Sequence, residues 1–123
     1  MPLSRDFRET VQARVKSDPS FRRGLLSEAV EGLLSGELEL GKELLRDYIN
    51  ATMGFPSLAV RTKIHVKTLH QMFGPKGNPT AKNLLEIVAC LQQAEGVRFK
   101  IDSSRAALRH RPPSTRGMKT ERG

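Results

Sequence analysis

The side chains best suited to contact a ligand are concentrated between residues 61 and 82. Two of them carry groups that can recognise bases, because Lys67 can donate to the acceptors of guanine, or instead hold a phosphate, and Gln71 can pair in two directions with adenine. Val66 can contact a thymine methyl group. Further cations, hydroxyl groups and a helix cap in this stretch could hold phosphates, which sets affinity and register without reading sequence. These phosphate candidates are Arg61, Lys63, Thr68, Lys76, Thr80 and Lys82.

Other kinds of site find little support in the same residues. His65 and His70 lack the i, i+4 register of a helical metal site, and Cys90 belongs to the apolar run LLEIVACL. The loop GPKGNP lacks the GK[ST] ending and the preceding strand of a phosphate-binding glycine loop. No nucleophile or carboxylate pair lies in a setting that would tune it for catalysis. The sequence therefore predicts a protein that is not an enzyme and binds neither a metal ion nor a cofactor.

The net charge of +8 favours a polyanionic partner, and its distribution along the chain indicates where that partner would bind. Residues 1–55 carry eight Lys or Arg against nine Asp or Glu, residues 56–101 carry seven against two, and residues 102–123 carry six against two. We therefore expect nucleic acid to face the second half of the chain, which leaves the first half for packing or protein partners.

The spacing of apolar residues predicts an all-α fold, a bundle of five to six helices. The expected helices cover residues 4–16, 19–34, 37–52, 56–62, 66–73 and 81–93. Asp18 and Thr80 are predicted to cap the helices that follow them, and Gly36 is predicted to end the second helix. We expect Leu40 to face the core and the helix over 81–93 to be the central buried one.

The end of the chain has a different pattern. Residues 97–101 alternate apolar with charged, which predicts a short half-buried strand. Such a strand would pair with another chain or a partner's sheet, or else lie as an extended segment on the helices. The following residues predict a disordered basic tail. The expected organisation is an N-terminal helical region over 1–43, a DNA-binding region over 44–101 and the tail over 102–123.

The sequence also bears on the compartment. No apolar stretch approaches the roughly 18 residues that a membrane span requires, and charged residues occupy the N-terminus where a signal peptide needs an apolar core. The single cysteine, Cys90, leaves no internal disulfide, which fits a reducing environment. We expect a cytoplasmic protein that does not contact membranes.

The two short helices expected over 56–62 and 66–73 have the spacing of a helix-turn-helix. In that motif one helix lies across the phosphates while the next enters the major groove. The first helix needs a small residue at the crossing, and the turn needs an apolar plug. Leu58 and Ala59 would lie inside the first helix, Ile64 would plug the turn, and Leu69 with Phe73 would anchor the second helix.

The string LAVRTKIHVKTLHQMFGPKGNP (residues 58–79), followed by TAKNLLEIVACL, resembles the helix-turn-helix of the Xre/Cro/CI superfamily, and most of all its HigA-like addiction-module antitoxins. The resemblance covers roughly residues 44–101. It implies a lambda-repressor-like fold and base contacts from the start and outer face of the second helix. These residues are His65, Val66, Lys67, His70 and Gln71. Lys63 departs from the pattern, in which glycine is common, so we expect either a different turn or a left-handed backbone there.

Three functions remain open. The first is a transcriptional repressor that binds a double-stranded operator as a homodimer, since one recognition helix neutralises few phosphates. As the resemblance implies, it would be the antitoxin of a type II toxin-antitoxin pair, binding a RelE/HigB-like toxin and repressing its own operon. The second is a stand-alone phage-type or genomic regulator with no toxin. The third is a basic scaffold or RNA-associated protein that binds without sequence preference through its tail.

Overall fold

The computed structural model describes residues 5–103, and all regular secondary structure in this range is helical. The helices are α1 (Arg5–Ser17), α2 (Pro19–Leu34), α3 (Leu38–Ala51), α4 (Gly54–Thr62), α5 (Val66–Met72) and α6 (Ala81–Glu95). The predicted all-α fold is confirmed, and each expected helix boundary lies within two residues of the observed one. Residues 104–123, which hold nearly all of the predicted disordered basic tail, lie outside the described residues.

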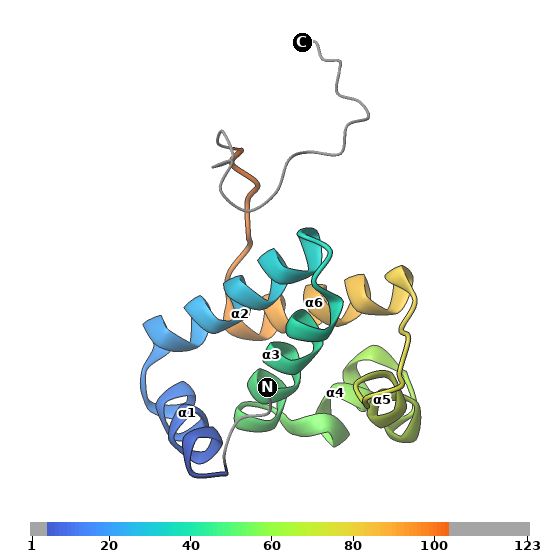
Figure 1. The fold of residues 1–123 in the computed structure, drawn as a ribbon, viewed down its shortest axis with the longest axis horizontal. Coiled ribbons are helices and arrows are strands. Elements are labelled where there is room, and N and C mark those ends of the chain that lie inside the picture. The colour runs from blue at the N-terminus through green and yellow to red at the C-terminus, as the bar shows by residue number, and fades with distance from the viewer. Residues whose placement is uncertain (1–4, 104–123) are drawn as a thin grey trace.

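Helix α3 forms the centre of the molecule (Figure 1), where it packs against α1, α2 and α4. Its buried apolar side chains are those of Leu45, Tyr48, Ile49 and Ala51. The expectation that residues 81–93 form the central helix was wrong, because Leu85 of α6 is 68% exposed. The apolar side chains of α6 span a wider face of the helix than its neighbours cover.

Local signals explain where the N-terminal helices begin and end. The Asp18 carboxylate accepts a hydrogen bond from the Phe21 N–H at 3.1 Å, which caps α2 as predicted and lowers the pKa of Asp18. Gly36 adopts a left-handed backbone with φ 83° and ends α2, also as predicted. The α2–α3 hairpin is tight, since a Cβ at Gly32 would lie 3.6 Å from the Gly41 nitrogen.

A buried polar cluster joins the ends of three helices. Arg22, at the start of α2, donates from Nε to both carboxylate oxygens of Glu95 at 2.9 Å. Glu95 ends α6 and also accepts a hydrogen bond from the hydroxyl of Tyr48 in α3. Burial, followed by this contact with Glu95, raises the pKa of Tyr48. The cluster fixes α2, α3 and α6 relative to one another.

Two expectations about exposed apolar positions were wrong. Leu40 is 45% exposed, because the first turn of α3 faces α2 through Gly41 and not through Leu40. Residues 97–101 do not form a strand, and the described residues contain no strand with which they could pair. Of the alternatives that the sequence left open, the extended segment on the helices is the one observed, since Phe99 packs on the core and its N–H donates to Gln92 Oε1 at 2.8 Å, whereas Ile101 is 80% exposed. Within the described chain, no helix is long and apolar enough to span a membrane.

The buried phenol of Tyr48 predicts a specific loss of stability at alkaline pH. Because its pKa is raised in the folded state, the phenol stabilises the fold below the ordinary pKa of about 10, and this contribution is lost as the pH rises above that value. We expect Tyr48→Phe to lower the free energy of unfolding by about 1 kcal/mol at pH 7. Above pH 10 the free energy of unfolding should fall less steeply for the variant than for the parent in urea titrations.

Tyr48 is the single tyrosine of the chain, so its ionisation can be followed directly by ultraviolet absorbance. Phenolate absorbance should appear only as the protein unfolds. Phenolate formed in the folded protein near pH 10, or parallel stability curves for the two proteins, would contradict the burial of the phenol and its contact with Glu95.

Candidate nucleic-acid interface

Helices α4 and α5 are joined by a turn of three residues, 63–65, in which Lys63 has a left-handed backbone with φ 62° and ψ 24°. Of the two options left open by the sequence, the structure therefore adopts the left-handed one, at a cost of roughly 1 kcal/mol for a residue with a Cβ. The turn is held from both sides, since the Lys63 N–H donates to Ala59 O at 2.8 Å and the Ile64 N–H to Thr62 Oγ1 at 3.3 Å.

The apolar anchors of this helix pair lie where the sequence predicted. Leu58 in α4 and Leu69 in α5 are completely buried, and Phe73 at the end of α5 is nearly so. Ile64 in the turn and Ala59 in α4 pack on the same core. This packing turns one side of α5 inward and leaves the opposite side of the helix to solvent.

The outer side of α5 presents Lys67, Thr68 and Gln71, all exposed. Lys67 and Gln71 are four residues apart and so lie on one face of the helix. Among the described residues, neither side chain takes part in a hydrogen bond or an ion pair, since Lys67 contacts His65 through its backbone N–H alone. Both side chains can therefore reach outward. These two residues form an exposed pair of candidate base-reading groups without other side-chain partners among the described residues.

The other three predicted base-contact residues are more constrained. His65 is the N-cap of α5, and its Nδ1 accepts a hydrogen bond from the Lys67 N–H at 3.1 Å, which leaves only Nε2 free to act outward. The His70 ring lies on Phe55 of α4 with 4.8 Å between ring centroids. Val66 is half-buried against the core.

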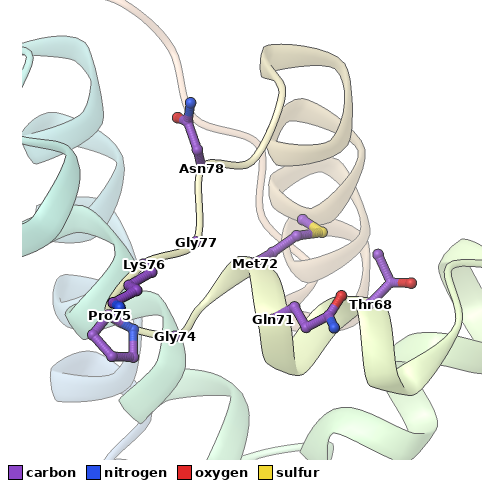
Figure 2. A pocket seen from close by; sticks show the side chains of 8 residues that line it. All are labelled: Thr68, Gln71, Met72, Gly74, Pro75, Lys76, Gly77 and Asn78. Carbon is purple, nitrogen blue, oxygen red and sulfur yellow. The ribbon is translucent and has the colours of Figure 1, made fainter.

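A hollow of about 560 Å³ lies between α5 and the loop that follows it. Figure 2 shows Thr68, Gln71 and Met72 on the helix and residues 74–78 along the loop, with Pro75 and Lys76 at its bend. The hollow brings two predicted phosphate residues, Thr68 and Lys76, next to the predicted base-reading residue Gln71. A polar helix face and an exposed ammonium group therefore border one depression in the surface.

The remaining phosphate candidates are distributed more widely. Thr80 caps α6 as predicted, through its hydroxyl and the Asn83 N–H at 3.1 Å. Lys82 forms an exposed ion pair with Glu86 at 2.8 Å, which reduces the charge it can offer to a phosphate. Lys63 is exposed in the turn. Arg61 lines a separate cavity of about 400 Å³, together with Tyr48 and Glu95 and with no residue of α5.

Two cations that hold this region in place were not predicted from the sequence. Lys42 of α3 is 2% exposed, and its Nζ donates to Gly74 O at 3.0 Å and Gly77 O at 2.9 Å. Arg46, one turn later, donates to Phe73 O at 3.2 Å. A signal was present, because Lys42 lies on the same helical stripe as the core residues Leu45 and Ile49, where a solvent-facing charge is not expected.

No group of residues in the described chain could hold a metal ion.

The loop after α5 depends on a close approach at Gly77. A Cβ there would collide with the carbonyl oxygens of Gln71 and Met72, which belong to backbone and cannot move aside alone. We expect Gly77→Ala to lower the free energy of unfolding by about 2 kcal/mol, because the loop must leave its position. Urea denaturation of the purified variant would measure this.

Gly24 provides the matched control. It lies within α2, and a Cβ there would meet no atom within 4 Å. Gly24→Ala should therefore raise the free energy of unfolding by about 0.5–1 kcal/mol, as alanine does inside a helix. Equal effects of the two substitutions would show that the contact at Gly77 is unimportant.

Comparison of the chain with known proteins returns no match to a family model, to a curated protein or to a solved structure. The feature that bears most directly on function is the short helix α5, which is anchored on one side by Leu69 and polar on the other.

Proposed function

We propose that this protein is a transcriptional repressor that binds double-stranded DNA through a helix-turn-helix formed by α4 and α5, as in the Xre/Cro/CI superfamily. The observation that carries the proposal is the exposed pair Lys67 and Gln71 on the outer face of a helix whose inner face is buried. A lysine and a glutamine on adjacent turns match the acceptors of guanine and the paired donor and acceptor of adenine in the major groove.

In the proposed complex, α5 lies in the major groove and the surrounding groups contact the backbone. Thr68 and Lys76, which line the hollow, and the exposed Lys63 in the turn would contact phosphates in this complex. His65 contributes through Nε2 alone, and Val66 and His70 contribute less than Lys67 and Gln71 because packing restrains them. The charge of residues 56–101, seven basic against two acidic, favours this arrangement.

The length of α5 bears on the stoichiometry. Seven residues rise only about 10 Å, so one copy reads few base pairs and neutralises few phosphates. Useful affinity for an operator therefore requires a homodimer on two half-sites about one helical turn of DNA apart. Such a repressor would act in the cytoplasm.

The base-reading role of Lys67 and Gln71 can be tested by fluorescence anisotropy. We expect specific binding to a duplex from upstream of the gene, and Lys67→Ala/Gln71→Ala should weaken it by about 30-fold or more, since each base contact contributes about 1–3 kcal/mol. Binding to a scrambled duplex should change much less. The titrations are made at two salt concentrations to separate phosphate contacts from base contacts.

A matched control has the same residue types outside the interface. Lys100→Ala/Gln93→Ala removes one exposed lysine and one exposed glutamine, and it should leave the preference for the upstream duplex unchanged. Equal binding of both duplexes by the parent protein, lost when residues 104–123 are removed, would instead support a protein that binds nucleic acid nonspecifically through its tail.

An antitoxin role is a second proposal, and an exposed surface of the N-terminal half favours it. Leu34 and Leu40 flank the α2–α3 turn and are 68% and 45% exposed. Three exposed glutamates lie close to them in the chain, namely Glu31, Glu37 and Glu39. An acidic surface with apolar side chains suits a basic protein partner such as a RelE/HigB-like toxin.

Co-expression with a small basic protein encoded next to this gene would test the antitoxin role. We expect the two proteins to co-purify, and Leu34→Glu/Leu40→Glu to abolish the complex while DNA binding persists. Leu85→Glu, at an equally exposed leucine of α6, is the control and should have no effect. Failure of the parent protein to bind or neutralise its neighbour would favour a stand-alone regulator.

A further inference from the structure

Lys42 is a buried cation for which the proposed DNA contacts have no direct use. It is 2% exposed, so its ammonium group cannot reach a phosphate or a base. We propose that Lys42 is a positioning residue: it holds the loop over residues 74–77 so that Lys76 can contact the DNA backbone. This inference rests on the proposed function and assigns a remote residue to the same interface.

The contacts of Lys42 fix both ends of one turn. The Gly77 N–H donates to Gly74 O at 3.0 Å, which closes a four-residue turn with Pro75 and Lys76 in the middle. Lys42 Nζ donates to the carbonyl oxygens of Gly74 and Gly77, the first and last residues of that turn. One side chain from the centre of the fold therefore determines where the middle of the turn lies.

The turn has few other means of holding its position. Its backbone meets the end of α5 where the Gly74 N–H donates to Gln71 O at 3.2 Å and where Gly77 approaches the carbonyl oxygens of Gln71 and Met72. Gly74 and Gly77 have no side chains to pack, Pro75 and Lys76 are exposed, and the hollow lies between the middle of the turn and the outer face of α5 (Figure 2). The neighbouring cation Arg46 donates to Phe73 O, at the end of α5 and before the turn begins. Only Lys42 among the described side chains donates to the turn itself.

Burying the charge has a free-energy cost that an apolar residue would avoid. Lys42 occupies a place on the apolar stripe of α3, where a methionine of similar length could pack without loss of solvation. Its ion pair with Glu39 offsets little of this cost, because the distance is 3.4 Å and Glu39 is mostly exposed. The hydrogen bonds to the turn are what the charged group adds.

The test is a double-mutant cycle on DNA binding as a function of salt concentration. Lys76→Ala removes one phosphate contact, so the slope of log affinity against log salt should fall by about one. Lys42→Met should lower the slope by the same amount and weaken binding by the same factor, although its ammonium group is buried. Lys42→Arg, which keeps the charge and the donors, should restore most of the parent slope.

The double variant distinguishes positioning from a direct effect of charge. In the Lys76→Ala background, Lys42→Met should weaken binding no further, because the contact that it positions is already gone. Additive losses would overturn the proposal, since a long-range electrostatic effect of Lys42 would act whether or not Lys76 is present. If Lys42→Met does not fold, Lys42→Gln replaces it in the cycle, because its side chain is uncharged and one bond shorter, so that it cannot hold both carbonyl oxygens of the turn.

A destabilised control separates loss of positioning from loss of fold. Val15→Ala creates a cavity in α1, far along the chain from the turn, and should leave the salt slope unchanged. If the parent protein binds DNA specifically and Lys42→Met keeps its slope, the positioning role is wrong and the proposed function stands. If the parent protein shows no specific binding, both fail.

Discussion

The burial of one face of α3 is the constraint on which the rest of the structure depends. Leu45, Tyr48 and Ile49 are almost completely buried, and their burial removes apolar surface from water where α3 meets α1, α2 and α4. Because α3 contacts helices on both sides, the near-neutral and the basic parts of the chain form one folded unit. The regions over 1–43 and 44–101, which the sequence predicted as separate parts of the chain, share this core.

Two buried charged contacts then set the relative positions of the helix ends. Glu95 is satisfied by Arg22 and Tyr48, and Lys42 by the backbone of the turn after α5. A buried charge with its partners in place restricts geometry more than an apolar contact, because displacement leaves an unpaired charge in a poorly solvated site. These contacts lie near helix termini, where apolar packing alone would permit one helix to slide past another.

The properties of α5 follow from this framework. A helix of seven residues is too short to be stable in water by itself, so its structure depends on Leu69, on the cap from His65 and on the cations of α3 at its C-terminal end. These supports are all on the inner side or at the ends of the helix. The outer side, with Lys67 and Gln71, remains available for the proposed base contacts.

Most of what is local in this fold was determined by the sequence. Helix boundaries, the caps at Asp18 and Thr80 and the anchors Leu58 and Leu69 follow from side-chain type and helical period, since each depends on residues a few positions apart. The left-handed Lys63 was one of two options that the turn allowed. Long-range partners decided the rest. Four features depend on residues far apart in the chain, which a periodic pattern does not pair. They are the central place of α3, the segment over 97–101 lying on α6, the separation of Arg61 from α5 and the reach of Lys42 to Gly74 and Gly77.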